Sequence, residues 1–272
     1  MIIVGLSNSK RLAKRIAQKL NLDYEDLEIL DTHEGEIHVK FKHKLENQKV
    51  VLVQSLYPHP NYSLFEVLFA ASAARDLKAK EVIYVAPYMA YLKKDSRVER
   101  GEGIGGKIIG DLLSRHVDSV MAVELYFSQH SIKGFFSVPF YKLNCSELLR
   151  EYVLKNLEDV EVIGVGDKAK LLARHIKKDA LSYNKGDKLE GFEDKDVVVV
   201  DNTISSGKTM LENLKNLKAN KVYLLGVHGL FTGDAYKNLN EKVEKVVTTN
   251  TVYHETNDLD VSGLIARKLM EL

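Results

Sequence analysis

The sequence has one cysteine, few prolines, no excess charge of either sign and no long hydrophobic run. The single cysteine, Cys145, excludes an internal disulfide and a cysteine-rich zinc site. The 39 Lys and Arg residues balance 38 Asp and Glu residues, which argues against nucleic acid or a membrane surface as a partner. The apolar stretch at residues 1–5 is too short for a signal peptide or a membrane span. With 17 glycines and 4 prolines in 272 residues, the chain is not of low complexity, and we expect a globular cytoplasmic protein.

Short apolar runs alternate with longer amphipathic stretches along the whole chain. The runs are rich in Val and Ile and carry no charge at their centres, as expected of strands covered on both faces. These predicted strands are residues 2–5, 50–53, 81–86, 119–125, 160–165, 196–201, 221–227 and 245–249. The predicted helices are residues 8–20, 62–78, 104–116, 145–157, 168–178, 208–218, 234–242 and 259–271. The repeated order of strand, helix and strand predicts an α/β fold with mainly parallel sheet flanked by helices.

Two segments break this alternation. Residues 28–42 contain a glycine turn followed by alternating apolar residues, which predicts a hairpin. Residues 182–195 are polar and contain glycine, which predicts a loop. Four predicted strands precede residue 140 and four follow it, so we expect two similar α/β halves joined near residues 135–143.

The strongest local signal lies at residues 196–211, DVVVVDNTISSGKTML. A buried strand there ends in Asp201 and is followed by a small polar loop and a helix. Open α/β sheets bind ligands at the carboxyl ends of their strands. A Ser/Thr/Gly loop that leads into a helix offers backbone amides, hydroxyls and the positive end of the helix dipole to an anion. The segment therefore predicts an anion site, with Asp201 facing the molecule that carries the anion.

Two chemistries use such a loop, and an ordinary strand-to-helix turn with a polar cap is a third interpretation. Asn202, Gly207, Lys208 and Thr209 match a P-loop, except that Asn202 stands where its first glycine is expected. In a phosphoribosyl-binding loop, the acid instead holds sugar hydroxyls while the loop holds the 5-phosphate. The second interpretation is favoured, because a P-loop normally lies early in its domain and has no acid directly after its strand.

A second signal lies at residues 86–103, where cations follow the predicted strand 81–86. The cations are Lys93, Lys94, Arg97 and Arg100. Together with nearby tyrosines, they suit a site that clamps a polyphosphate and stacks a base. Asp95 and two glutamates lie among them, so a solvated charged loop explains the same run equally well. The acidic turn within residues 32–40 is by itself only a hairpin turn.

Taken together and in order, these segments resemble the ribose-phosphate pyrophosphokinase (PRPP synthetase) family, particularly its short archaeal type. The resemblance covers essentially the whole chain. The segments that carry it are IIVGLSNSKRLAKRIAQKL, HEGEIHVK, VAPYMAYLKKDSRVERGEGI, SIKGFFSVPF, VVVVDNTISSGKT and VHGLFTGDAYKNL. Each segment alone is weak, whereas their shared order and spacing are specific to the family.

The resemblance implies two phosphoribosyltransferase-like halves and a defined reaction. Residues 1–142 would form an N-terminal domain on the ATP side, with a hairpin flag at 28–42. Residues 143–258 would form a C-terminal domain that binds ribose 5-phosphate, and residues 259–272 a helix that packs back on the first domain. Members transfer a diphosphoryl group from Mg-ATP to ribose 5-phosphate, which implies Mg²⁺ as cofactor. They form homodimers or higher homo-oligomers, and a catalytic homologue is a further candidate partner.

The resemblance also implies roles for individual residues. Glu34 and Glu36 match a flag turn that contacts the adenine of a neighbouring subunit. The ATP loop falls on Lys93, Lys94, Asp95 and Arg97. The ribose-5-phosphate loop falls on Asp201, Asn202, Thr203, Ser205, Ser206, Gly207, Lys208 and Thr209.

Two departures from the family pattern concern catalysis. The family's metal-binding His follows an Asp-Leu pair, and His130 reaches that place only through a shifted loop. Asp167 matches the acid of the diphosphate-binding loop, so His130 and Asp167 are the candidate metal ligands. The family also uses a Lys and an Arg on a flexible loop, but residues 182–195 contain no arginine. Lys185 and Lys188 are therefore the candidate catalytic cations, without the planar fork of Arg.

Three functions stay open on the sequence alone. The first is an active PRPP synthetase, and the second is a non-catalytic homologue that binds nucleotide or sugar phosphate and regulates or scaffolds a partner. The third is a phosphoribosyltransferase that consumes PRPP, for which the sequence shows no base-recognising segment. The retained Asp201, the phosphate loop and the cationic loop favour the first.

Overall fold

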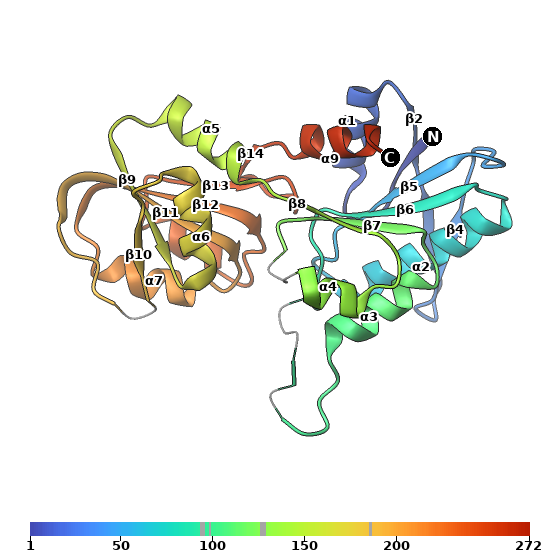
Figure 1. The fold of residues 1–272 in the computed structure, drawn as a ribbon, viewed down its shortest axis with the longest axis horizontal. Coiled ribbons are helices and arrows are strands. Elements are labelled where there is room, and N and C mark those ends of the chain that lie inside the picture. The colour runs from blue at the N-terminus through green and yellow to red at the C-terminus, as the bar shows by residue number, and fades with distance from the viewer. Residues whose placement is uncertain (93–95, 98, 126–128, 185–186) are drawn as a thin grey trace. The chain divides into compact units, whose positions relative to one another are not determined.

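The computed structural model describes residues 1–92, 96–97, 99–125, 129–184 and 187–272, without the side chains of residues 129 and 130. The chain divides into two compact units (Figure 1). Unit 1 comprises Met1–Leu143 and Ser262–Leu272, and unit 2 comprises Asn144–Val261. Within the described ranges, no helix combines the length and the apolar character needed to cross a bilayer.

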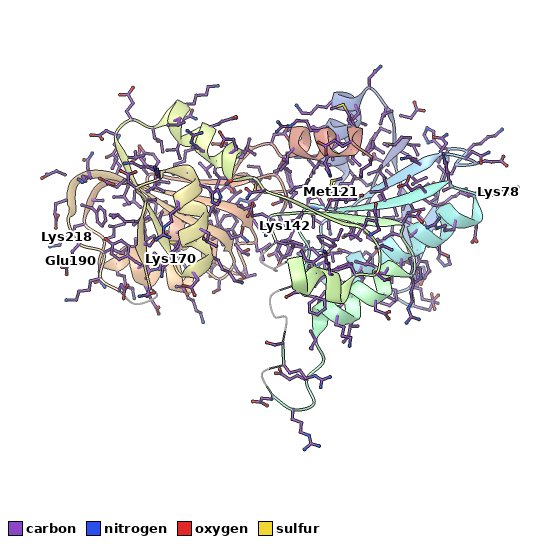
Figure 2. All side chains as sticks on the ribbon, in the orientation of Figure 1. Lys78, Met121, Lys142, Lys170, Glu190 and Lys218 are labelled. Atoms are coloured by element: carbon purple, nitrogen blue, oxygen red, sulfur yellow. The ribbon has the colours of Figure 1, made fainter. Side chains whose placement is uncertain are left out.

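Unit 1 is built on a parallel sheet that has six strands in the described residues. In spatial order they are β2 (Asp23–Asp26), β1 (Ile2–Gly5), β5 (Lys49–Val53), β6 (Glu81–Ala86), β7 (Ser119–Val123) and β8 (Phe140–Leu143). The helices are α1 (Lys10–Leu20), α2 (Pro60–Asp76), α3 (Gly105–Ser114), α4 (Gln129–Phe135) and α9 (Ser262–Met270). Figure 1 shows α1 and α9 on one face of the sheet and α2, α3 and α4 on the other. Because both faces are covered, the central strands are mostly apolar after their first residue, and Met121 of β7, labelled in Figure 2, is fully buried.

A hairpin, the flag, follows β2 in unit 1. It consists of β3 (Glu28–Asp31) and β4 (Ile37–Lys40), which pair antiparallel in a separate two-stranded sheet. Ile29, Val39 and Phe41 are partly buried and pack against the core of unit 1. The alternating apolar residues thus attach one side of the hairpin to the unit, and the predicted flag is confirmed.

Unit 2 contains a second parallel sheet, again with six strands in the described part of the chain. In spatial order they are β10 (Leu181–Tyr183), β9 (Val160–Val165), β11 (Phe192–Ile204), β12 (Ala219–Gly229), β13 (Lys245–Thr249) and β14 (Asn257–Leu259). The helices are α5 (Ser146–Asn156), α6 (Asp167–Ile176), α7 (Lys208–Lys215) and α8 (Ala235–Asn240). Val197 and Val199 of β11 lie in the core with Leu224 of β12 and Leu239 of α8.

The two sheets have the same connectivity. Numbered along the chain within each unit, the strands of both lie in the spatial order 2-1-3-4-5-6 and pair in parallel. In each sheet the first and third strands are neighbours, and the chain leaves them toward opposite edges. Such a switch point opens a crevice beyond the carboxyl ends of the strands, where ligands bind. The switch point lies between β1 and β5 in unit 1, and between β9 and β11 in unit 2.

The predicted α/β class with a mainly parallel sheet in each half is confirmed, and the differences lie at the edges. The strands β2, β8, β10 and β14 lie outside the predicted ones. They are short, and β2 (DYED) and β14 (NDL) are polar, because an edge strand pairs on one side only. The loop predicted for residues 182–195 is wrong at both ends, since β10 and the first residues of β11 occupy them.

The C-terminal helix α9 belongs to unit 1 and packs against α1. Lys49 Nζ donates a hydrogen bond to the carbonyl oxygen of Leu272 at 2.8 Å. Lys268 Nζ lies 4.9 Å from the centre of the Tyr141 ring.

The assignment of unit 1 to ATP and of unit 2 to ribose 5-phosphate stays a prediction.

Candidate substrate-binding site

The end of β11 leads directly into the predicted phosphate loop. Asp201 and Thr203 are partly exposed, whereas Asn202 and Ile204 are buried, since alternate residues of a strand face opposite sides. Asp201 Oδ1 accepts a hydrogen bond from the backbone amide of Thr203 at 3.3 Å. The strand therefore presents Asp201 and Thr203 on one face and Asn202 on the other.

The loop between β11 and α7 consists of Ser205, Ser206 and Gly207. Gly207 has a φ of 69°, in the left-handed region that favours glycine. Among the described residues, the backbone amides of Ser206 and Gly207 have no hydrogen-bond acceptor. Lys208 and Thr209, the first residues of α7, are exposed. Open amides, hydroxyls and a helix start together have the chemistry of an anion site.

The segment after β12 holds this loop in place. The backbone amides of Leu230 and Phe231 donate to the carbonyl oxygen of Ile204 at 2.8 and 3.1 Å. The amide of Thr232 donates to the carbonyl oxygen of Ser205 at 3.1 Å. The position of the phosphate loop therefore depends on a second loop at the same edge of the sheet.

The neighbouring strand β9 ends in a tight turn to α6. A Cβ on Gly164 would lie 2.4 Å from the carbonyl oxygen of Ala169, so the turn requires glycine. Asp167 is the first residue of α6, and its side chain is 98% exposed. Because Val200 pairs with Gly164, the loops after β9 and β11 begin side by side. The structure thus places Asp167 and Asp201 on neighbouring loops of the switch point.

Lys170 of α6, labelled in Figure 2, contacts both the start of α6 and the loop after β10. Its Nζ lies 3.5 Å from Asp167 Oδ1 and donates a hydrogen bond to Asn184 Oδ1 at 2.8 Å. Asn184 directly follows β10 and begins the loop predicted to carry the catalytic lysines. This loop therefore starts at the same edge of the sheet as the phosphate loop.

Of the two predicted catalytic lysines, only Lys188 is among the described residues. Lys185 lies outside the described residues. Lys188 is exposed, and its Nζ lies 4.0 Å from Glu190 Oε1, so its partner in this structure is an acid of the same loop. The adjacent Leu189 is buried with Phe192 in the core of unit 2 and anchors the loop. The structure does not bring Lys188 to Asp201, and the catalytic role of both lysines stays a prediction.

The tip of the flag carries Glu34 and Glu36, which are both exposed. Thr32 closes the turn, because its carbonyl oxygen accepts the amide of Gly35 and its Oγ1 accepts the amide of Glu36, each at 3.1 Å. Gly35 has a φ of 86°, which only glycine adopts without strain. The turn is therefore well specified by its own residues, and it presents two carboxylates to solvent.

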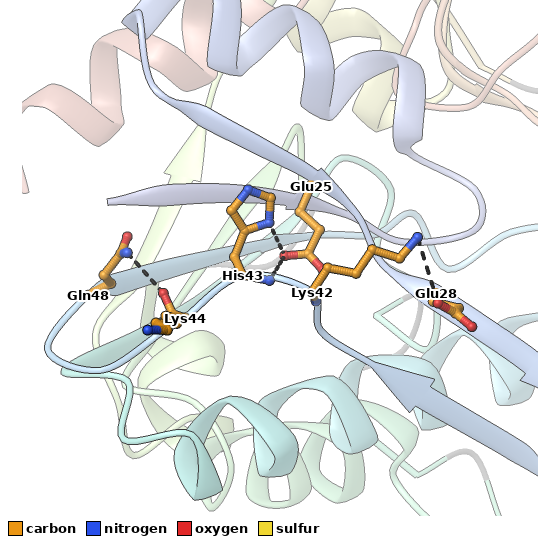
Figure 3. Close-up of polar contacts among 6 residues, drawn as sticks. All are labelled: Glu25, Glu28, Lys42, His43, Lys44 and Gln48. Atoms are coloured by element: carbon orange, nitrogen blue, oxygen red, sulfur yellow. Dashed lines mark hydrogen bonds and ion pairs between the residues drawn. The ribbon is translucent and has the colours of Figure 1, made fainter.

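A buried acid ties the base of the flag to the edge of the sheet (Figure 3). Glu25 of β2 is 3% exposed, and its Oε1 accepts the backbone amide of Lys42 at 2.6 Å. Its Oε2 accepts the backbone amide of His43 at 3.2 Å and lies 2.6 Å from His43 Nδ1. Lys42 Nζ lies 3.7 Å from Glu28 of β3. The chain that leaves β4 is thus fixed to β2, and the flag has a defined base.

The predicted ATP loop is described in part. The residues outside the described ranges are Lys93, Lys94 and Asp95. Arg97 is exposed and lines a pocket of about 550 Å³ in unit 1. Lys107 of α3 and Lys133 of α4 line the same pocket, together with Asp111. Three cations against one acid give this pocket the positive charge that phosphate groups require.

The predicted metal ligands do not form a closed metal site. His130 lies in α4, and its side chain is outside the description. In the part of the chain that the structure describes, no three His, Cys, Asp or Glu residues are grouped to hold a metal ion. Mg²⁺ commonly keeps several waters and binds through one or two carboxylates plus substrate phosphates. The exposed Asp167 fits that mode of binding, as a carboxylate at the switch point of unit 2.

Glu66 of α2 is a candidate that the sequence pattern did not single out. It is fully buried, and its Oε2 accepts hydrogen bonds from Ser7 Oγ at 2.7 Å and from Gln54 Nε2. Its Oε1 has no hydrogen-bond partner among the described residues. Burial raises the pKa of the Glu66 carboxyl to about 7, against the lowering effect of the Ser7 hydrogen bonds. The signal in the sequence is an acid on a helix face shared with the small residues Ser63 and Ala70.

Known proteins match this chain over both units. Residues 1–116 match the N-terminal domain of ribose phosphate pyrophosphokinase, and residues 186–269 match the phosphoribosyl synthetase-associated domain. A ribose-phosphate pyrophosphokinase of Aquifex aeolicus is 32% identical, over 92% of this chain and 86% of its own length. The chain belongs to the ribose-phosphate pyrophosphokinase family. A relative of the same name from Methanopyrus kandleri is 29% identical, over 100% of this chain and 99% of its own.

The fold of this family member agrees with a solved structure. The crystal structure of phosphoribosylpyrophosphate synthetase from Mycobacterium smegmatis matches it with a TM-score of 0.85, over 99% of this chain and 97% of that one. The two sequences are 22% identical, so the match is evidence for the fold. It confirms the predicted pair of α/β halves. Family membership makes this chain a relative of transferases that serve PRPP synthesis.

Proposed function

We propose that the chain is a ribose-phosphate diphosphokinase that makes PRPP and AMP from ATP and ribose 5-phosphate. The C1 hydroxyl oxygen of the sugar forms a bond to the β-phosphorus of ATP. The bond from that phosphorus to the oxygen shared with the α-phosphorus breaks, AMP leaves with that oxygen, and the hydroxyl proton is released. The observation that carries the proposal is the open loop at 201–209, which lies at a switch point of a chain whose relatives are named for this reaction.

Unit 2 binds ribose 5-phosphate in this proposal. The Asp201 carboxylate is partly exposed at the end of β11, where it can accept hydrogen bonds from sugar hydroxyls. The 5-phosphate accepts hydrogen bonds from the open amides of Ser206 and Gly207 and lies at the start of α7. Asn202 supports the strand from its buried face. The hydroxyl and cationic side chains that complete the loop are Thr203, Ser205, Lys208 and Thr209.

Unit 1 binds ATP in this proposal, and the flag acts on a neighbour. The pocket at Arg97 receives the phosphates, because Lys107 and Lys133 add to its positive charge. The rest of the ATP loop consists of Lys93, Lys94 and Asp95. Glu34 and Glu36 contact the adenine held by a second copy of the chain. The active form is therefore a homodimer or a higher homo-oligomer.

Charge stabilisation supplies most of the catalysis, because phosphoryl transfer needs alignment and neutralisation more than covalent help. When bound, Mg²⁺ neutralises charge on the phosphate oxygens of ATP. Asp167 and His130 are the residues of this chain that we assign to its binding. Lys185 and Lys188 bring positive charge to the transferred diphosphoryl group. Lysine supplies this charge as a point rather than as the planar fork of arginine.

The test is the formation of AMP by the purified full-length chain with Mg-ATP and ribose 5-phosphate, followed by chromatography. We expect AMP to appear only when ribose 5-phosphate is present. Unphosphorylated ribose is the matched control and should give far less AMP, because nothing then occupies the phosphate loop. The absence of AMP at several pH values and with Mg²⁺ or Mn²⁺ would exclude the enzyme. Thermal shifts with ADP or ribose 5-phosphate in that case would instead identify a non-catalytic homologue.

A further inference from the structure

The switch point of unit 1 carries a pocket that the proposed reaction does not use. Its volume is about 920 Å³, within the usual range of small-molecule sites. The loop after β1, the loop after β5, the first turns of α2 and the flag all contribute to its walls. It therefore lies in unit 1 where the phosphate loop lies in unit 2, at the carboxyl ends of the first and third strands.

The polar groups of the loop after β1 are already paired with groups of the loop after β5 and of α2. The backbone amide of Asn8 donates to Gln54 Oε1 at 3.0 Å. Asn8 Nδ2 donates to the carbonyl oxygen of Ser55 at 3.1 Å and to Ser63 Oγ at 2.8 Å. Ser9 Oγ accepts the backbone amide of Ser55 at 2.9 Å. The amides of Asn8 and Ser9 at the centre of this loop both have acceptors, unlike those of Ser206 and Gly207 in unit 2, so the loop is less suited to a phosphate group.

The charges in the pocket also argue for an uncharged ligand. Lys10 and Asp31 both line it, and their opposite charges offset one another. Glu66 lines it as well, and its Oε1 has no partner in the described part of the chain. With two donors on Oε2, the neutral acid carries its proton on Oε1 and acts as a donor, whereas the ionised form acts as an acceptor. A hydroxyl group pairs with either form, because it is both donor and acceptor.

Part of the pocket wall is apolar. Ile29 of the flag, Pro58 and Pro60 line it, together with Tyr62 of α2. The Tyr62 hydroxyl donates a hydrogen bond to Asp31, which fixes the position of the ring. A pocket that combines aromatic and aliphatic side chains with hydrogen-bonding groups fits a flat base attached to a sugar.

We propose that this pocket of unit 1 is a second ligand site, which binds an uncharged nucleoside with a sugar hydroxyl on Glu66 and the base against Tyr62 and Ile29. The site is independent of the proposed reaction, because it shares no residue with the assigned ATP and ribose-5-phosphate sites. A ligand hydroxyl would satisfy Oε1 once the Glu66 side chain turns this atom toward the pocket, whereas its present burial without a partner costs the folded state free energy.

The test is calorimetric titration of the full-length chain with adenosine at millimolar concentration, with adenine as the matched ligand that lacks the sugar. We expect adenosine to bind one molecule per chain, and adenine at least tenfold more weakly. Glu66→Met, which has no polar group at this place, should weaken adenosine binding at least tenfold. Glu66→Gln keeps a donor toward the ligand and should stay within about threefold of the parent. Lys10→Trp, which fills the pocket from its exposed rim, gives a second blocking variant if Glu66→Met is unstable.

The proposal would be overturned by no binding of adenosine, by equal binding of adenine, or by adenosine binding that neither Glu66→Met nor Lys10→Trp weakens. Loss of adenosine binding in Arg97→Ala would also overturn it, because the ligand would then occupy the assigned ATP pocket. The formation of AMP from ATP and ribose 5-phosphate is measured separately on the same variants, so a failure of the proposed function stays distinguishable from a failure of this site.

Discussion

The two switch points have the same strand order, but their polar groups differ in whether they are already hydrogen-bonded within the protein. In unit 1, Asn8 of the loop after β1 donates hydrogen bonds to Gln54 and Ser55 of the loop after β5. In unit 2, the amides of Ser206 and Gly207 have no acceptor among the described residues. The fold provides a crevice in both places, and the groups that stay open decide the ligand. An anion suits the second crevice, whereas an uncharged molecule suits the first.

The insertions after the second strand differ in the same way. In unit 1 this insertion is the flag, which Glu25 fixes at its base. In unit 2 it is the loop after β10, which Lys170 contacts at Asn184 and Leu189 anchors in the core. One insertion is a folded hairpin with acids at its tip, and the other is a loop with lysines. The following predictions test these differences between the two units and the functions assigned to them.

The largest effect is expected from removing both lysines of the loop after β10. The Lys185→Ala and Lys188→Ala double variant should lower kcat for AMP formation about 10³-fold, as the loss of a transition-state cation does elsewhere. Steady-state kinetics measures this change. Lys178→Ala, which removes an exposed lysine outside this loop, should leave kcat unchanged. If the double variant keeps the kcat of the parent, the lysines of this loop have no catalytic role.

The next effect concerns the glycine at or next to the end of the first strand of each unit, Gly5 in β1 and Gly164 in β9. A Cβ on Gly164 meets the carbonyl oxygen of Ala169 at 2.4 Å, whereas on Gly5 the nearest atom is the Cα of Lys10 at 2.9 Å. Gly164→Ala should lower the free energy of unfolding by about 3 kcal/mol, and Gly5→Ala by about 1 kcal/mol. Urea denaturation measures both. Equal effects would show that the two turns are equally tight.

A third effect is a pH dependence that comes from Glu66. Because its pKa is raised from 4.5 to about 7, the folded chain keeps a proton that the unfolded chain releases between these pH values. The free energy of unfolding should therefore fall as pH rises through this window, by about 2 to 3 kcal/mol, and stay lower above it. Glu66→Gln should remove this decrease. Urea denaturation at pH values below and above the window compares the two proteins, and parallel curves would contradict the assignment.

A smaller effect is expected at the phosphate loop. Asp201→Asn should raise KM for ribose 5-phosphate about tenfold or more, because a charged acceptor for the sugar hydroxyls is lost. Asp196→Asn changes an acid at the other end of the same strand and serves as the control. Circular dichroism should show the same fold for both. If Asp201→Asn leaves KM unchanged, the sugar does not bind at the end of β11.

The sequence predicted the parts of the fold that are buried on both faces. The runs at 50–53, 81–86 and 160–165 match strands almost residue for residue, since a strand covered on both faces is mostly apolar. The edge strands β2 and β14 were not predicted, because tertiary pairing rather than local pattern defines them.

The candidate site was predictable where one segment contains it. The order of acid, small polar loop and helix at 201–209 predicted a phosphate loop, and the structure has a strand end, a loop and a helix start there. The approach of Asp167 to this loop and the contact of Lys170 with Asn184 depend on strand order, which no local pattern reveals. Glu66 was not predicted because its burial is a property of the packed helix α2.

The fixed base of the flag has a consequence for kinetics. Glu25 anchors the base of the hairpin, so the exposed Glu34 and Glu36 at its tip are held at a fixed distance from the rest of unit 1. In the proposed function these acids complete a neighbour's nucleotide site. Specific activity should then decline on dilution as subunits dissociate, and Glu34→Ala mixed with an Arg97→Ala partner should regain part of the activity that each variant lacks alone. Such complementation, measured as AMP released per chain, would show one catalytic centre assembled from two polypeptides.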